Sequence, residues 1–390
     1  KKEGYYMSVS MESRMERYLI SLVADALNQN ESAEIKWKPS WEWIYKMSDY
    51  HHVANLVYYK VMWSDDARVR KWKERFEERY KSAIRLQERN QILRDQIEQE
   101  LEKKEIHALF VGESAILRYY ERPEMRTPEP LQILVQKKKY DDARRAVISM
   151  GFEEIIDRQN QKTGLFVKIP DQRIRLLHEL PFSGKKVKMW FKDMPGELPR
   201  EDGRHYIHYM NEETLYIYFI CRLADKFARG QAEIRDVTDL WAVVSKEGHR
   251  MKWKEVREEL ESLELETFGE YIVKLAGKWF GNMHFYGDND LLNAMQTYIL
   301  SKGAYGRREN ENVLPLVPGV VDSYYRDLRK EEKRKMREMQ FPPLEYMAVS
   351  FPKLKKWPLL LPAYWIIRLA KKWKFTKKEQ SKLGKDEDKA

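Results

Sequence analysis

The sequence of 390 residues is 43% hydrophobic and 34% charged, and its formal net charge is +10 at pH 7. It contains no apolar run long enough to span a bilayer and no N-terminal run of signal-peptide length, which excludes a membrane-spanning chain and favours a soluble one. The single cysteine, Cys221, cannot form an internal disulfide, so we expect a reducing, cytoplasmic environment. The length allows one large domain or two to three smaller ones.

Residues 1–105 are predicted to form an N-terminal helical region. Lys1–Ser10 shows no clear periodicity and is predicted to be a leader, whereas apolar residues recur at helical spacing in the segments that follow. The predicted helices span Met11–Leu27, Trp41–Met62 and Asp66–Glu105. The apolar stripe of the longest helix is rich in aromatic residues and drifts from a strict heptad, which favours packing within the monomer over a coiled-coil dimer. The adjacent residues His51 and His52 would point apart on a helix, which favours surface or capping positions over a metal site.

Residues 106–210 are predicted to form an α/β core. An apolar strand, Leu109–Val111, leads into a turn at Gly112 and a short helix-like segment. A second strand, an amphipathic helix and two alternating segments that form a hairpin follow. These later elements span Leu131–Val135, Tyr140–Met150, Leu165–Ile169 and Arg173–Glu179. Val187–Phe191 is predicted to be an edge strand or an extended loop.

Residues 211–375 are predicted to form a C-terminal helical region, followed by a basic polar tail over residues 376–390. Asn211 is the expected N-cap of the first helix, and Cys221 lies in an apolar helical run in which we expect it to be buried. The predicted helices span Asn211–Phe227, Trp253–Leu263, Phe268–Phe280, Leu291–Leu300 and Asp322–Gln340. Leu359–Lys374 mixes apolar and basic residues as interfacial membrane helices do, but its prolines and few turns favour a closing helix packed on the helical region.

The order of these elements resembles the minimal nucleotidyltransferase fold, and more narrowly a family of uncharacterised bacterial nucleotidyltransferases. The matching residues are Gly112, Arg126, Ile133–Val135, Gly151 and Phe152 in the core, and Arg235 and Asp239 in the C-terminal helical region. The resemblance extends over roughly residues 15–375. It implies an α+β fold in which a small mixed nucleotidyltransferase-like sheet is flanked by helices, with predominantly helical N-terminal and C-terminal regions.

The resemblance also implies a magnesium site made of carboxylates, because nucleotidyl transfer joins a polyanionic triphosphate to a nucleophile. The three implied positions in this sequence are Pro130, Gln132 and Leu176. Proline and leucine side chains have no ligand atom, and the neutral amide of glutamine attracts a divalent cation only weakly. Our first hypothesis is therefore a catalytically degenerate, nucleotidyltransferase-like protein that acts by binding.

Two other functions remain open at this point. In the first, the protein is an active nucleotidyltransferase that uses Mg²⁺ and takes displaced carboxylates from Glu113, Glu129 and Glu179. Glu129 is one residue away from the expected register, so its side chain would point to the opposite face of a regular strand. In the second, the protein is an adaptor whose basic C-terminus contacts an anionic membrane or nucleic acid.

For the binding hypothesis we expect a nucleotide, a small anionic metabolite or a protein as the partner. The expected ligand-binding residues are Gly112, Ser114, Arg126, Gln132, Arg235 and Asp239. Ser114 suits a phosphate at a helix N-terminus, and Arg126 suits bidentate contact with an anion. The structural alternatives are an N-cap at Ser114, a loop salt bridge at Arg126 and a helix-surface or interhelical pair at Arg235 and Asp239. Much of the excess positive charge comes late in the chain, so we do not expect nucleic acid to bind the core.

Overall fold

The computed structural model describes residues 2–31, 37–64, 67–155, 163–192, 194–281, 283, 290–301, 321 and, with short gaps, 326–368. The chain divides into two compact units, Lys1–Tyr324 and Tyr325–Ala390. The boundaries predicted near residues 105 and 210 both lie inside the first unit. The predicted basic tail, residues 376–390, lies outside the described residues, as does much of the predicted helix Asp322–Gln340.

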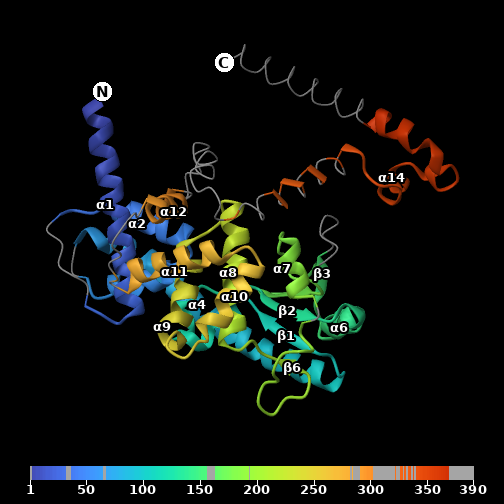
Figure 1. The fold of residues 1–390 in the computed structure, drawn as a ribbon, viewed down its shortest axis with the longest axis horizontal. Coiled ribbons are helices and arrows are strands. Elements are labelled where there is room, and N and C mark those ends of the chain that lie inside the picture. The colour runs from blue at the N-terminus through green and yellow to red at the C-terminus, as the bar shows by residue number, and fades with distance from the viewer. Residues whose placement is uncertain are drawn as a thin grey trace. The chain divides into compact units, whose positions relative to one another are not determined.

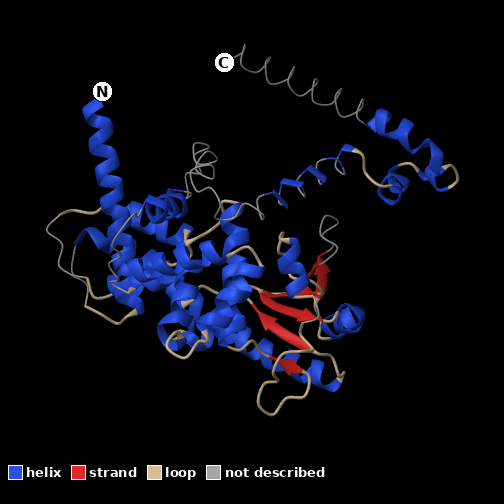
Figure 2. Cartoon of the chain, viewed as in Figure 1, coloured by secondary structure: helices blue, strands red, loops and turns tan. Residues whose placement is uncertain are grey.

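The first unit contains a mixed six-stranded sheet, shown as red arrows in Figure 2. Its strands are β1 (Ala108–Val111), β2 (Leu131–Val135), β3 (Glu153–Ile155), β4 (Thr163–Lys168), β5 (Gln172–Leu177) and β6 (Ile207–His208). They lie in the order β3-β4-β5-β2-β1-β6, with β1 antiparallel to β2 and β2 parallel to β5. The predicted α+β fold and the hairpin of β4 and β5 are confirmed.

Helices α4 (Ala67–Lys103) and α6 (Tyr140–Ser149) cover one face of the sheet (Figure 1). The core between them contains side chains from every layer, namely Leu93, Ile97, Leu101, Phe110, Ile133, Val135, Val147, Ile174 and Leu176. Alternate strand residues point to this face, as period-2 patterning requires. The predicted packing of the long helix within its own chain is therefore confirmed.

Helix α8 (Glu212–Ala228) and helix α9 (Ile234–Glu247) pack against each other in the C-terminal part of the first unit. Asn211 is the N-cap of α8, as predicted, and its side-chain oxygen accepts a hydrogen bond from the Thr214 N–H at 3.0 Å. Cys221 is buried in α8, also as predicted. Tyr218 of α8 brings this helix to the end of β1, because its hydroxyl accepts a hydrogen bond from the Gly112 N–H at 3.1 Å.

The remaining helices complete the two units. In the first unit they are α1 (Lys2–Leu27), α2 (Trp41–Tyr50), α3 (Ala54–Val61), α5 (Glu113–Ile116), α7 (Lys185–Trp190), α10 (Trp253–Ser262), α11 (Glu266–Phe280) and α12 (Asp290–Ser301), with short 3-10 turns η1 (Leu117–Tyr119), η2 (Pro123–Met125) and η3 (Lys137–Lys139). The second unit contains α14 (Leu344–Ser350), η6 (Pro352–Lys355) and η7 (Pro358–Leu360). Across the described residues, no helix combines the length and the apolar character needed to cross a bilayer.

Three predicted elements differ from the structure. Residues 2–10, predicted as a leader, continue helix α1, because extending a helix that is already nucleated costs little. The predicted helix Trp41–Met62 is broken into α2 and α3, since His52 has a φ of 54° that ends regular helix geometry. Val187–Phe191 lies in helix α7 and its C-cap, where the i, i+4 pair Val187 and Phe191 is buried on one side.

Candidate functional site

The turn after β1 contains a glycine whose backbone conformation disfavours any other residue type at that position. Gly112 has a φ of +68°, a conformation that L side chains rarely adopt. A Cβ at this position would lie 2.8 Å from Gln132 Nε2 and 3.1 Å from Arg222 Nη1. The turn, strand β2 and helix α8 therefore meet at one point, and the absence of a side chain at residue 112 leaves room for two nitrogen donors.

The register of the sheet decides which side chains face that point. Gln132 of β2 lies opposite Val111 of β1 and Arg175 of β5, so these three side chains share one face. Leu176 lies opposite Ile133 and points into the core on the other face. The side chain of β5 that lies on the same face as Gln132 is thus the exposed Arg175. Leu176, the position that the resemblance implies for a carboxylate, lies on the opposite face.

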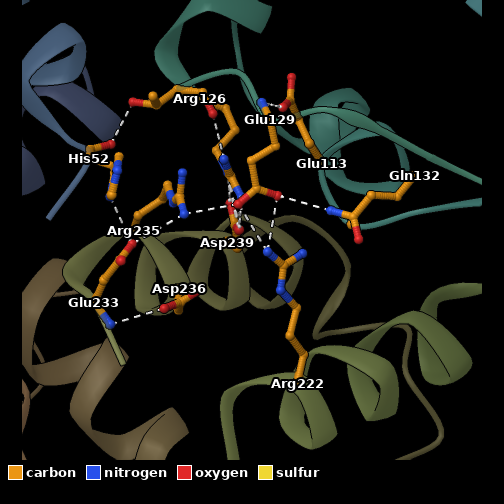
Figure 3. A network of polar contacts seen from close by, with 12 residues as sticks. His52, Glu113, Arg126, Glu129, Gln132, Arg222, Glu233, Arg235, Asp236 and Asp239 are labelled. Carbon is orange, nitrogen blue, oxygen red and sulfur yellow. Dashed lines mark hydrogen bonds and ion pairs between the residues drawn. The ribbon is translucent and has the colours of Figure 1, made fainter. Parts of the chain in front are cut away.

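Glu129 lies just before β2 and is surrounded by arginines, as Figure 3 shows. Its carboxylate is 3.0 Å from Arg222 Nη2, 2.9 Å from Arg235 Nη2 and 3.6 Å from Arg126 Nη2. Burial alone would raise the pKa of Glu129, but the positive charges of Arg222, Arg126 and Arg235 outweigh it and hold the pKa well below its usual range. This carboxylate is therefore ionised and neutralised by the protein itself.

Arg126 is fully buried and paired with Asp239 of helix α9. Arg126 Nε donates to Asp239 Oδ1 at 2.8 Å, and its Nη2 donates to Oδ2 at 2.9 Å. Arg126 Nη1 donates to the Thr127 carbonyl at 2.6 Å, and the Tyr120 hydroxyl donates to Asp239 Oδ1 at 2.7 Å. Because these donors are used inside the protein, Arg126 joins the α/β core to the C-terminal helices.

Glu113, the residue after the glycine, is also buried. Its Oε1 accepts a hydrogen bond from Gln87 Nε2 at 2.6 Å, and its Oε2 accepts one from the backbone N–H of Glu129. Burial raises the pKa of Glu113 to about 7, and the neighbouring charge of Glu129 adds to the rise. Glu113 and Glu129 are thus side by side, yet each uses its oxygens for contacts within the fold.

A second set of ion pairs surrounds the start of α9. Glu233 and Asp236 form a capping box there, and Lys226 Nζ lies 2.6 Å from Asp236 Oδ2. His52 Nδ1 lies 3.0 Å from Glu233 Oε2, so the break between α2 and α3 contacts the same network. Arg235 joins the two halves of the network, since its Nη2 also lies 3.2 Å from Glu233 Oε2.

The structure brings most of the predicted residues together through contacts within the protein. Arg235 pairs with Glu129 and Asp239 pairs with Arg126, so both residues of α9 bond to the core. Ser114 lies in α5, where its carbonyl accepts a hydrogen bond from Arg94 Nη1 at 3.3 Å and where Gly112 is the N-cap. Glu179 follows β5 and lies 4.0 Å from Lys188 Nζ of α7.

Arg222, which contributes most to holding the pKa of Glu129 low, was not predicted from the sequence. A signal was present, because Arg222 interrupts the buried run Leu215–Leu223 of helix α8. A charged residue inside such a run is retained only when it is paired or functional. Gln87 was not predicted either, because a glutamine is an ordinary residue on a charged helix and its role depends on its burial, which the sequence does not show.

These side chains do not fit a magnesium ion. Mg²⁺ requires oxygen ligands in nearly octahedral geometry. The carboxylate of Glu129 is already neutralised by guanidinium groups, and the strand that follows presents only the neutral amide of Gln132. Among the residues that the structure describes, no group of three or more His, Cys, Asp or Glu side chains is arranged to hold a metal ion.

Comparison with known proteins identifies one family. A family model described as an uncharacterised nucleotidyltransferase matches residues 38–281, a stretch that runs from α2 to the end of α11 and includes the whole sheet. Searches of curated proteins and of solved structures found no match.

Proposed function

Because the chain belongs to the uncharacterised nucleotidyltransferase family, we propose that it uses the family's sheet to bind a phosphate-bearing ligand, such as a nucleotide, without transferring a nucleotidyl group. The observation that carries the proposal is the position of Glu129 between Arg222, Arg235 and Arg126. In a metal-dependent transferase a divalent cation neutralises the acidic residues beside the phosphates. In this protein fixed guanidinium groups have that role.

The carboxylates nearest to Gly112 are poorly suited to replace the missing ones. A metal ion at Glu129 would have to displace guanidinium groups that are held in a buried network. Glu113 has a pKa of about 7 because it is buried, so much of it is protonated near neutral pH and binds cations weakly. These observations favour the binding function over an active transferase with displaced carboxylates.

The donors beside Gly112 favour an anionic ligand. Within the described part of the chain, Arg222 Nη1 is buried without a hydrogen-bond partner. A buried donor without a partner costs on the order of 1–3 kcal/mol, more when it is charged, and a ligand oxygen would remove that cost. Guanidinium and amide N–H groups only donate, so Arg222 and Gln132 together suit the oxygens of a phosphate.

The test is to measure nucleotide binding by calorimetry in EDTA and, separately, in excess MgCl₂. We expect ATP or GTP to bind in EDTA, and we expect Arg222→Gln and Gln132→Leu to weaken binding at least about tenfold through loss of a charged and a neutral donor. Arg229→Gln is the matched control, because Arg229 is the C-cap of the same helix and pairs with Asp225 at 3.0 Å. Binding that requires Mg²⁺, or that is equal in all variants, would contradict the proposed site.

A second measurement addresses catalysis directly. The purified protein should release no pyrophosphate from nucleoside triphosphates with Mg²⁺ and a range of acceptors, because the site lacks available carboxylates. Sustained release that Glu129→Gln or Glu113→Gln abolishes, with the fold retained, would show that the displaced carboxylates are catalytic and would overturn the proposal.

A further inference from the structure

The second unit is organised around a small apolar cluster. Met347, Ala348 and Leu354 are buried, and residues 361–368 form a helix that packs against them. The helix contributes Leu361, Tyr364 and Trp365 to this cluster, at the i, i+3 and i+4 spacing of a single helix face. The inner face of the helix, formed by these three residues, is thus covered by the rest of the second unit.

The outer face of the same helix is apolar as well. Ile366 is 69% exposed and Ile367 is 43% exposed, and Pro362 and Ala363 beside them are also exposed. An ordinary surface helix carries polar residues on this side. A helix that is apolar on both sides needs a second apolar surface to cover it.

The segment before the helix extends the apolar surface. Leu359 is 95% exposed and Trp357 is 66% exposed, although both belong to a short structured stretch that includes η7. Single exposed apolar residues are common on proteins, but a group of them in one short stretch usually marks an interaction site.

Positive charge accompanies these residues. Lys353, Lys355 and Lys356 are exposed immediately before Trp357. The sequence contains no Asp or Glu from Tyr346 to Lys378, and further lysines follow the helix at positions 371, 372, 374, 377 and 378. An apolar surface with basic neighbours and no acidic ones complements a partner that is apolar inside and anionic at its surface.

We propose that the unit Tyr325–Ala390 binds the surface of an anionic lipid bilayer, with Trp357, Leu359 and Ile366 entering the boundary between headgroups and acyl chains. The lysines at 353, 355 and 356 lie against the anionic headgroups. Tryptophan is favoured at this depth because its ring is apolar and its N–H is polar. This proposal does not depend on the proposed ligand site beside Gly112.

Two other partners fit the same surface less well. A second copy of the chain would bring lysines against lysines across a two-fold axis, and no acidic residue from Tyr346 to Lys378 would offset the repulsion. A nucleic acid would satisfy the lysines, but it would leave Leu359 and Ile366 without an apolar partner, since strand binding relies on aromatic stacking and phosphate contacts.

The test is co-sedimentation of the full chain with two kinds of vesicle. One contains phosphatidylcholine alone, and the other also contains about 30% phosphatidylserine as the anionic lipid. We expect binding to the anionic vesicles that weakens as salt rises, because the lysine attraction is screened. The double variant Leu359→Ser with Ile366→Ser should lose binding at least about tenfold, and Lys355→Ala with Lys356→Ala should lose about fivefold per lysine.

Matched controls come from the first unit. Trp63→Ser with Met189→Ser changes two apolar residues that are 81% and 62% exposed, and Lys252→Ala with Lys254→Ala removes two exposed lysines. Both control variants should bind as the unchanged protein does. Failure of the full chain to bind anionic vesicles at low salt, or binding that the Leu359 and Ile366 variant retains, would overturn the proposal.

The same variants identify the other partners. Oligonucleotide binding that competes with vesicles and depends on the lysines alone would assign the surface to nucleic acid and contradict the membrane site. A concentration-dependent dimer that the Leu359 and Ile366 variant dissolves, without any vesicle binding, would assign it to a second copy of the chain and would also contradict the membrane site.

Discussion

Replacing Asp239 by asparagine tests whether the core and the C-terminal helices are held together by a buried ion pair. Asp239 has no exposed surface and Arg126 is only 1% exposed, so water cannot take over the lost interaction. The substitution keeps the shape of the side chain and removes its charge. Breaking a buried pair on one side costs about 3–5 kcal/mol, because the remaining charge stays buried. We expect Asp239→Asn to destabilise the first unit by that amount, reduced in part by Glu129 at 3.6 Å from Arg126.

The assay is denaturant unfolding followed by circular dichroism, with Asp95→Asn as the matched control. Asp95 is an exposed aspartate that accepts a hydrogen bond from Gln91 at 2.9 Å, so its substitution should change the free energy of unfolding by no more than about 0.5 kcal/mol. The double variant Arg126→Met with Asp239→Leu removes both charges and should be less destabilised than Asp239→Asn alone.

Two results would refute this reasoning. If Asp239→Asn lowered the free energy of unfolding by less than about 1 kcal/mol, Arg126 would be neutralised mainly by Glu129, and the pair would not be the principal link. If the double variant were as destabilised as the separate variants Arg126→Met and Asp239→Leu added together, the two side chains would act independently, and the direct contacts between them would carry no energetic coupling.

Burial raises the pKa of Glu113 from 4.5 to about 7, so the contribution of Glu113 to stability is present below pH 4.5 and is lost as the pH rises through about 7. Glu113→Gln should remove this pH dependence of the free energy of unfolding, which is worth about 3 kcal/mol. The measurement is a set of unfolding curves recorded from pH 4.5 to 8. Gly112→Ala should destabilise more than Gly203→Ala, because both have a positive φ but only the Cβ at residue 112 would meet Gln132, and equal losses of melting temperature would contradict the crowding. Asn211→Ala should cost about 1 kcal/mol through loss of the N-cap, and a neutral result in the same unfolding assay would show that the hydrogen bond is replaced by water.

Much of the fold could be predicted because it depends on short-range patterns. The apolar strands β1 and β2, the alternating hairpin of β4 and β5 and the cap at Asn211 each carry their signal within a few residues. The family resemblance rested on the order of such elements and was confirmed by the match over residues 38–281. The secondary structure of Val187–Phe191 was predicted wrongly, because a pair of apolar residues four apart fits one turn of helix α7 as well as a loop.

The arrangement of charges, in contrast, depends on residues that are far apart in the sequence. Arg126 and Asp239 are separated by 113 positions and Arg222 and Glu129 by 93, so no local pattern pairs them. Their distances depend on how helices α8 and α9 pack against the sheet, and their ionisation depends on the water that this packing excludes.

The amino-acid sequence by itself determined that residues 130 and 132 carry no carboxylate, because the residue type alone decides which ligand atoms a side chain has. Only the tertiary structure decided which charged side chains lie beside these positions. The strand register put Arg175 rather than Leu176 on the face of Gln132, and the packing of α8 brought Arg222 to Glu129. Register and packing are cooperative properties of the whole fold, since each is specified by the sum of many distant contacts.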